Sequence, residues 1–313
     1  MPQPTHSHSD LVSALQKFIR RGMDKAAVAV GNELLDRILL VEYDVSMWTR
    51  LWARLHIIAT EDIGMAQYGA HEYLQQQHTQ ADLYFHSTDE RKKARRPTLD
   101  AILTLCRSPK SRLTDNSYIY FSRRSIISHT PDAVYEAIQN KDEHRLLQLI
   151  ASVYRQRKDK QSSTTKLNQL IAFLRAGLTE EVEPEAETIH RIYQTHGCVL
   201  YLMHLGLLVC RGLPARPCVP QSIDDLELTL SLKSGLLPDF VYDKHTKRGR
   251  DLFHRGLHHF VHEATRLKNC QITDPYYELL VDEVPEDEDE ICKEERMVSS
   301  LLDYDCFFYK DNH

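Results

Sequence analysis

The stretch DLVSALQKFIRRGMDKAAVAVGNELL, residues 10–35, decides the fold class of this chain. Leu11, Leu15 and Phe18 recur at the three- and four-residue spacing of one helix face. Gly22 interrupts that spacing, and apolar residues then resume it up to about residue 38. The stretch therefore predicts two consecutive amphipathic helices.

The same spacing continues through the rest of the chain. Further helices are predicted at about residues 46–64, 66–77, 97–106, 167–178, 188–210, 224–232 and 248–268, and residues 131–157 predict one or two more. Glycine and proline are sparse, with 11 and 12 residues among 313, which disfavours a sheet built on tight turns. The sequence predicts an all-α protein.

The order of these segments predicts two helical lobes. We expect a polar N-terminal tail (1–9), a first lobe (10–178), a second lobe with a His-rich helix (188–281) and an acidic C-terminal segment (282–313). The boundary is placed at residues 179–187 because this segment holds Pro184 and five glutamates.

Composition limits the class of partner and the compartment. Residues 1–176 carry 25 Lys and Arg against 19 Asp and Glu, while residues 177–313 carry 14 against 26, so a polyanion would meet the first half. The seven cysteines are scattered and never form a CxxC pair, which favours a reducing cytoplasm. The longest apolar stretch, residues 198–210, is too short to cross a bilayer, and we expect no membrane segment.

Several landmarks occur in a fixed order in the first third of the chain. They are residues 10–22, residues 24–28, the run Ala59-Thr60-Glu61-Asp62-Ile63-Gly64-Met65-Ala66, and Ser108-Pro109-Lys110-Ser111. In this order they resemble the C-terminal collar region of RarA/MgsA-type AAA+ ATPases, which are relatives of the clamp loaders. The resemblance implies a helical collar-like bundle that mediates oligomer formation. The sequence contains no GxxxxGK[ST] phosphate loop, so any ATP hydrolysis would come from a partner AAA+ ATPase.

Two features of this region can be interpreted either as structural or as functional. Trp48 and Trp52 lie at i and i+4 on one helix face, where they either fill the core, which we favour, or form an oligomer interface. Glu61 and Asp62 are adjacent carboxylates that point about 100° apart on a helix, so they do not converge on one proton or metal. We expect both acidic residues to be structural.

The strongest candidate for contact with nucleic acid is a basic run. It consists of Arg91, Lys92, Lys93, Arg95 and Arg96, and five charges in six residues can neutralise several phosphates. Lys110 is a further candidate for a phosphate contact. The alternative is a solvated loop and a solvated lysine.

The second candidate site is rich in histidine. Asp243, His245, His258, His262 and Glu263 have the residue types of a metal-dependent enzyme acting on a nucleotide or nucleic acid. A helix would align His258 and His262 with His254 on one stripe, but the outer two would lie about 12 Å apart and could not share an ion. The alternative is packing and surface histidines.

Together these observations predict a non-catalytic, oligomerising protein of DNA replication, recombination or repair. It would bind DNA, a partner ATPase, or both, and it would need no cofactor. The metal-dependent enzyme stays open as an alternative, as does an adaptor protein that never touches DNA.

Overall fold

The computed structural model describes residues 6–42, 44–128, 130–156, 162–225, 227–232, 237–251, 253–264, 267 and 272–284. Within these ranges the regular elements are helical, apart from an isolated bridge between Tyr68 and Pro217. The predicted all-α class is confirmed. In the described part of the chain, every helix is too short or too polar to cross a membrane.

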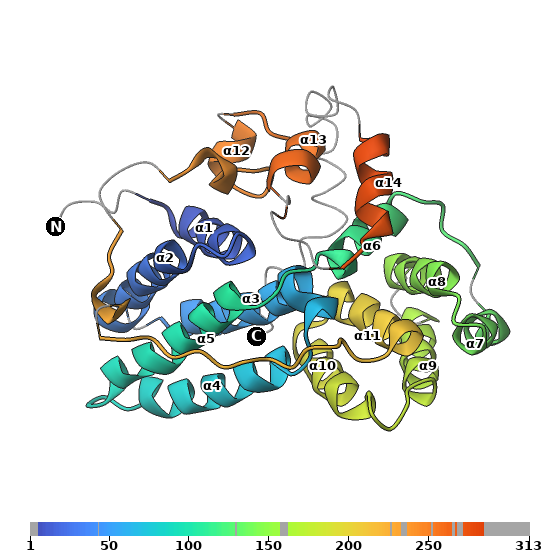
Figure 1. The fold of residues 1–313 in the computed structure, drawn as a ribbon, viewed down its shortest axis with the longest axis horizontal. Coiled ribbons are helices and arrows are strands. Elements are labelled where there is room, and N and C mark those ends of the chain that lie inside the picture. The colour runs from blue at the N-terminus through green and yellow to red at the C-terminus, as the bar shows by residue number, and fades with distance from the viewer. Residues whose placement is uncertain are drawn as a thin grey trace.

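The first five α-helices form one bundle (Figure 1). They are α1 (His8–Arg20), α2 (Asp24–Asp36), α3 (Val45–Ile58), α4 (Ala70–Phe85) and α5 (Arg95–Arg107), joined by η1 (Arg37–Glu42), η2 (Ala59–Ile63), η3 (Gly64–Ala66) and η4 (Arg91–Ala94). Leu11, Leu15 and Phe18, the residues that predicted α1, are all buried in its core. Trp48 and Trp52 lie in the same core with 2% and 0% exposure, which confirms the core interpretation over the interface one.

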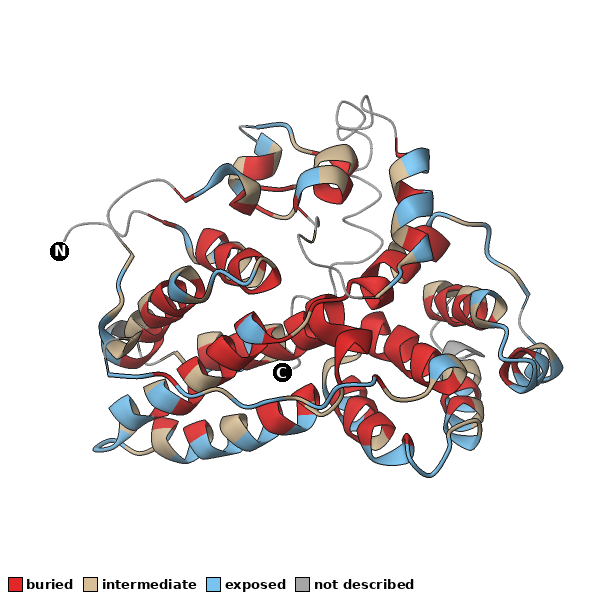
Figure 2. Ribbon diagram, viewed as in Figure 1, coloured by how far each residue is buried: buried red, intermediate tan, exposed pale blue. Residues whose placement is uncertain are grey.

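A second bundle follows on the other side of the molecule (Figure 1). It contains α6 (Leu113–Ser122), α7 (Pro131–Gln139), α8 (Glu143–Gln156), α9 (Ser162–Ala176), α10 (Glu183–His196) and α11 (Val199–Arg211). Its own core is centred on α11, where Leu202, Met203 and Leu207 are fully buried. Figure 2 shows buried residues concentrated in the middle of the molecule, where α6 and α11 both contact η2, so the two bundles pack directly on each other.

After α11 the chain returns to the first bundle. An extended segment runs back past α4 and α5 (Figure 1), and the Ile223 amide donates to Asp100 on α5 at 2.8 Å. The remaining elements are η5 (Glu227–Thr229), η6 (Asp239–Val241), α12 (Lys247–Asp251), α13 (Leu257–His259), η7 (Phe260–Ala264) and α14 (Pro275–Glu283). Val241 belongs to the first core, whereas Leu257 and Leu280 belong to the second.

This return path differs from the predicted division at residues 179–187. The hydrophobic cores change over between Cys106 and Leu113, and Pro184 stands in the first turn of α10, inside the second bundle. The predicted second lobe is shared between the two cores because the segment at 223–242 packs on the first. Residues 285–313, most of the predicted acidic segment, lie outside the described residues.

Two of the predicted long helices are wrong. The helix through residues 188–210 is two helices, because Gly197 adopts a φ of +65° that ends α10 before α11 begins. The predicted helix at 248–268 is broken between Asp251 and Leu257, where His254 has a φ of +49°. The predicted helix at 224–232 is reduced to the short turn η5.

Candidate functional site

The predicted nucleic-acid contact lies at the tip of the hairpin formed by α4 and α5 (Figure 1). Here η4 exposes Lys92 and Lys93, while Arg91 donates to the Phe85 carbonyl at 3.2 Å. Lys93 pairs with Glu90, and the hydrogen bond to that carboxylate raises the pKa of Lys93. Both members of this pair lie on the surface, where an ion pair contributes little and exchanges with other anions. Both lysines are therefore accessible to a phosphate.

The last two arginines of the run differ in accessibility. Arg95 donates to Asn32 Oδ1 at 2.7 Å and pairs with Asp36, so it ties α5 to α2, and its side chain is only 19% exposed. Arg96 pairs with Asp225 at 2.9 Å, and these side chains are 45% and 96% exposed. Arg96 can therefore exchange its partner for a phosphate, whereas Arg95 is part of the packing between two helices.

The prediction of a phosphate contact at Lys110 is wrong. This residue is 7% exposed, and its Nζ donates to the carbonyls of Leu105 and Cys106, both at 2.9 Å, and to that of Ser108. Two of these carbonyls belong to the last turn of α5, which has no helical partner for them. Lys110 thus caps the C-terminus of α5, and burial lowers its pKa to about 8.

The predicted histidine stripe is not formed. His254 lies between α12 and α13, outside any helix, so it does not align with the other two. His258 and His262 do stack, with ring centroids 4.3 Å apart, as their four-residue spacing requires. Glu263, which belongs to the same predicted site, is exposed, and its backbone carbonyl accepts from Arg21 at 2.8 Å.

The residues predicted for a metal site do not assemble into a set of ligands. Among the described residues, no three His, Cys, Asp or Glu side chains lie where they could hold one ion. His245 packs edge-on against Phe260, with centroids 4.8 Å apart, and burial lowers the pKa of His245 to about 3. Asp243 faces Lys17 instead of His258 or His262. The residues predicted for a metal-dependent enzyme are therefore not brought together into one site.

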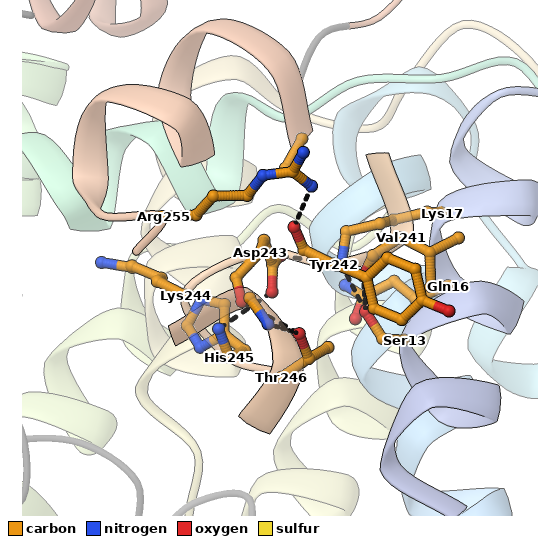
Figure 3. Close-up of polar contacts among 12 residues, drawn as sticks. Ser13, Gln16, Lys17, Val241, Tyr242, Asp243, Lys244, His245, Thr246 and Arg255 are labelled. Carbon is orange, nitrogen blue, oxygen red and sulfur yellow. Dashed lines mark hydrogen bonds and ion pairs between the residues drawn. The ribbon is translucent and has the colours of Figure 1, made fainter. Parts of the chain in front are cut away.

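Asp243 forms a buried ion pair with α1 (Figure 3). Its Oδ2 lies 2.7 Å from Lys17 Nζ, and the two side chains are 2% and 4% exposed. Although burial alone would raise it, the pKa of Asp243 lies well below its usual range because Lys17 stabilises the carboxylate. Ser13, one turn earlier, donates to the Val241 carbonyl at 2.7 Å, and the His245 amide donates to Asp243 at 2.9 Å.

A second buried network lies next to the first on α1. Asp62 accepts from Arg20 Nε at 2.6 Å and from Arg112 at 2.8 Å, and Arg20 also donates to the Ala264 carbonyl at 2.7 Å. Burial would raise the pKa of Asp62, but the two guanidinium groups hold it below its usual range. Burial raises the pKa of the neighbouring Glu61, which has no such close arginine pair.

These networks pair buried charges of opposite sign. Lys17 and Arg20 on α1 hold residues 241–264 through carbonyl and carboxylate oxygens, and Arg112 joins the second bundle to the π-helix η2. Each ionised carboxylate accepts hydrogen bonds from donors that are fixed in place, so the arrangement stabilises the junction of three chain segments.

No family model, curated protein or solved structure matches this chain.

Sequence reasoning missed the basic members of these networks. Ser13, Lys17 and Arg20 follow one another at i, i+4 and i+7, which places them on one side of α1. That spacing is the available signal, but every amphipathic surface helix shows a polar stripe of this kind. The burial of the stripe depends on residues 239–264, which follow more than two hundred positions later: Lys17 and Val241 are 224 positions apart.

The structure also shows a shallow groove between α4 and α10. It has a volume of about 480 Å³ and is lined by Glu72, Gln75, Gln76, Thr79, Gln80, Leu83, Thr188 and Arg191. Leu83 is 73% exposed, the highest value among the large hydrophobic residues of the described chain.

Proposed function

We propose that this chain is a non-catalytic, self-associating helical protein of DNA replication, recombination or repair that contacts nucleic-acid phosphates through the turn at residues 91–96. The observation that carries the proposal is the position of Lys92, Lys93 and Arg96 on the exposed tip of the α4–α5 hairpin. The carboxylate partners of Lys93 and Arg96 are surface residues, so a phosphate can replace them at little cost. ATP hydrolysis, where the process needs it, would come from a partner AAA+ ATPase.

The distribution of charge along the chain supports a phosphate contact at the same end of the molecule. The hairpin belongs to the half with an excess of Lys and Arg, whereas the half after residue 176 is strongly acidic. An anionic ligand is therefore drawn toward the first bundle and repelled from the acidic part of the sequence.

Fluorescence anisotropy with single-stranded, duplex and forked DNA over a salt series tests this contact. We expect binding that weakens with salt, and we expect Lys92→Gln with Lys93→Gln to reduce the slope of log K against log salt by about 1 for each phosphate that is no longer neutralised. Lys25→Gln with Arg50→Gln removes two exposed cations from the same bundle and serves as the control. Equal affinity of both double variants and the wild type would exclude the hairpin, and absence of binding at low salt would favour the adaptor alternative.

Self-association is assigned to the groove between α4 and α10. Gln75, Gln76 and Gln80 each carry an amide that both donates and accepts, so an identical stripe is a suitable partner, and Leu83 adds exposed apolar area. A two-fold interface places one patch against its own copy, which fits a self-complementary stripe.

Sedimentation analysis tests this surface. We expect Leu83→Glu to shift the protein toward monomer. Val219→Glu is the matched control, because Val219 is also apolar and 63% exposed but is not among the residues that line the groove. A wild-type monomer at all concentrations, or an equal effect of both variants, would contradict the assignment.

A further inference from the structure

Four histidines gather where the two bundles meet. They are His56 on α3, His71 on α4, His196 on α10 and His204 on α11, here called the histidine cluster. His56, His71 and His204 are 2%, 1% and 2% exposed, and His196 is half-buried. Ring centroids lie 5.5 Å apart for His56 and His71, 6.3 Å for His56 and His196, and 6.2 Å for His71 and His204. The cluster therefore links two helices of the first bundle to two of the second.

The hydrogen bonds of the cluster fix which ring nitrogens carry protons. Thr60, on the π-helix η2, donates its hydroxyl hydrogen to the His56 carbonyl at 3.2 Å. Its oxygen is 3.0 Å from His71 Nε2, which must then be the donor. His71 Nδ1 is left as an acceptor for the Nδ1–H of His56, at 3.2 Å. His71 is thus neutral, and neither nitrogen of this contact has room for another proton.

The surroundings of the cluster contain aromatic and histidine groups. From α4, His78 acts on the cluster and is itself 3.7 Å from Asp82. From α11, the Tyr201 ring meets His71 edge-on at 6.0 Å. From α8, Tyr154 donates to the Gly197 carbonyl at 3.1 Å, at the end of α10. Among the described residues, the charged groups that shift the pKa of His56 and His71 are other histidines, with no carboxylate among them.

We propose that the histidine cluster is a pH switch, in which neutral imidazoles hold α10 and α11 against α3 and α4 and protonation releases them. A proton on His71 Nδ1 would turn the lone pair that faces His56 into a second N–H opposite the first. A charge on His56 or His71 would be buried without a carboxylate to compensate it, which is costly. Opening the contact between the bundles lets water solvate that charge.

Burial supports this behaviour by lowering the pKa of each member. The pKa falls to about 3 for His56, to about 4 for His196 and His204, and well below its usual value for His71. A released histidine titrates near pH 6.5. Because the closed form binds fewer protons, its stability is complete above pH 6.5 and is lost as the pH falls from 6.5 toward 4.

Glu185 on α10 titrates in the opposite direction. Its Oε2 accepts from the Gly69 amide at 2.8 Å at the start of α4, and burial raises its pKa to about 7. A carboxyl with a raised pKa favours the closed form as the pH falls from 7 toward 4.5. One such group is outweighed by four histidines, so acid still opens the contact.

Hydrogen exchange of the full chain, corrected for intrinsic rates between pH 7.5 and 4.5, tests the switch. We expect amides of α10 and α11 to lose protection below pH 6.5 while amides of α1 and α2 keep theirs. His204→Leu fills the same buried space, and His204 Nδ1 has no hydrogen-bond partner that the change would remove. With a pKa of about 4 in the closed form, removing this histidine should lower the acid-induced opening at pH 5 by about 30-fold, relative to pH 7.5.

Two further variants make the result decisive. His196→Gln, at a half-buried position, should lower the opening in the same way and replaces His204→Leu if that variant does not fold. His86→Gln removes an exposed histidine at the end of α4 and should change nothing. Loss of protection in both bundles together, or the same pH dependence in wild type, His204→Leu and His196→Gln, would overturn the proposal.

Discussion

Asp62→Asn is expected to cost about 3–5 kcal/mol of unfolding free energy, because it breaks a buried ion network while leaving the other members in place. Asp62 is 0% exposed and accepts from Arg20 at 2.6 Å and from Arg112 at 2.8 Å. The side chains of both arginines are no more than 2% exposed. Asparagine keeps the shape but removes the negative charge, so the two guanidinium groups stay buried without this carboxylate to compensate them.

Urea unfolding at pH 7.5, followed by far-ultraviolet circular dichroism, measures this destabilisation directly. Asp225→Asn is the matched control, since Asp225 is 96% exposed and pairs with the exposed Arg96. That change should cost less than about 1 kcal/mol. If Asp62→Asn also costs less than about 1 kcal/mol with an unchanged denaturant slope, water reaches the network in the folded state and our description of it as desolvated is refuted.

Three other perturbations have expected outcomes that thermal or urea unfolding can check. Gly197→Ala should cost about 1 kcal/mol, because Gly197 has a φ of +65° while nothing lies within 4 Å of an added Cβ; a neutral result would mean the turn changes conformation. Lys110→Met should cost about 1–3 kcal/mol by leaving buried carbonyls at the end of α5 without a donor, and an increase in stability would contradict the cap. Asp243→Asn should lower stability at neutral pH and reduce its decline in acid, since the lowered pKa of Asp243 contributes stability that disappears as pH falls through its folded pKa; an unchanged pH profile would exclude the Lys17 pair as its cause.

Local patterns predict those parts of the fold that depend on neighbouring residues. The apolar spacing of Leu11, Leu15 and Phe18 is sufficient for α1, and Pro97, where the predicted helix at 97–106 begins, lies in the first turn of α5. The preference of helix ends for glycine also indicates the break at Gly197, because a glycine near the end of a helix commonly adopts positive φ. The apolar spacing nevertheless predicts one continuous helix there, since the residues on both sides of Gly197 have helical spacing.

Contacts between distant segments cannot be predicted in this way. The segment at 223–242 returns to the first core, and no local signal at 179–187 or at Cys106–Leu113 indicates that the chain returns there. Lys110 shows the same limitation at a single residue: its charge predicts exposure, while its position after α5 gives it three carbonyls to bind in the core. Burial of a charged side chain follows from partners that spacing along the chain does not reveal.

The histidines show most clearly what spacing can and cannot decide. His258 and His262 stack as their four-residue separation predicts, yet among the described residues no third ligand joins them. The four members of the histidine cluster come from four helices, carry no shared spacing, and meet in the interior instead. Spacing determines proximity within one helix, whereas a change in protonation acts most strongly where imidazoles from separate helices meet in the buried interior. A pH response of this protein should therefore be sought at the contact between its bundles.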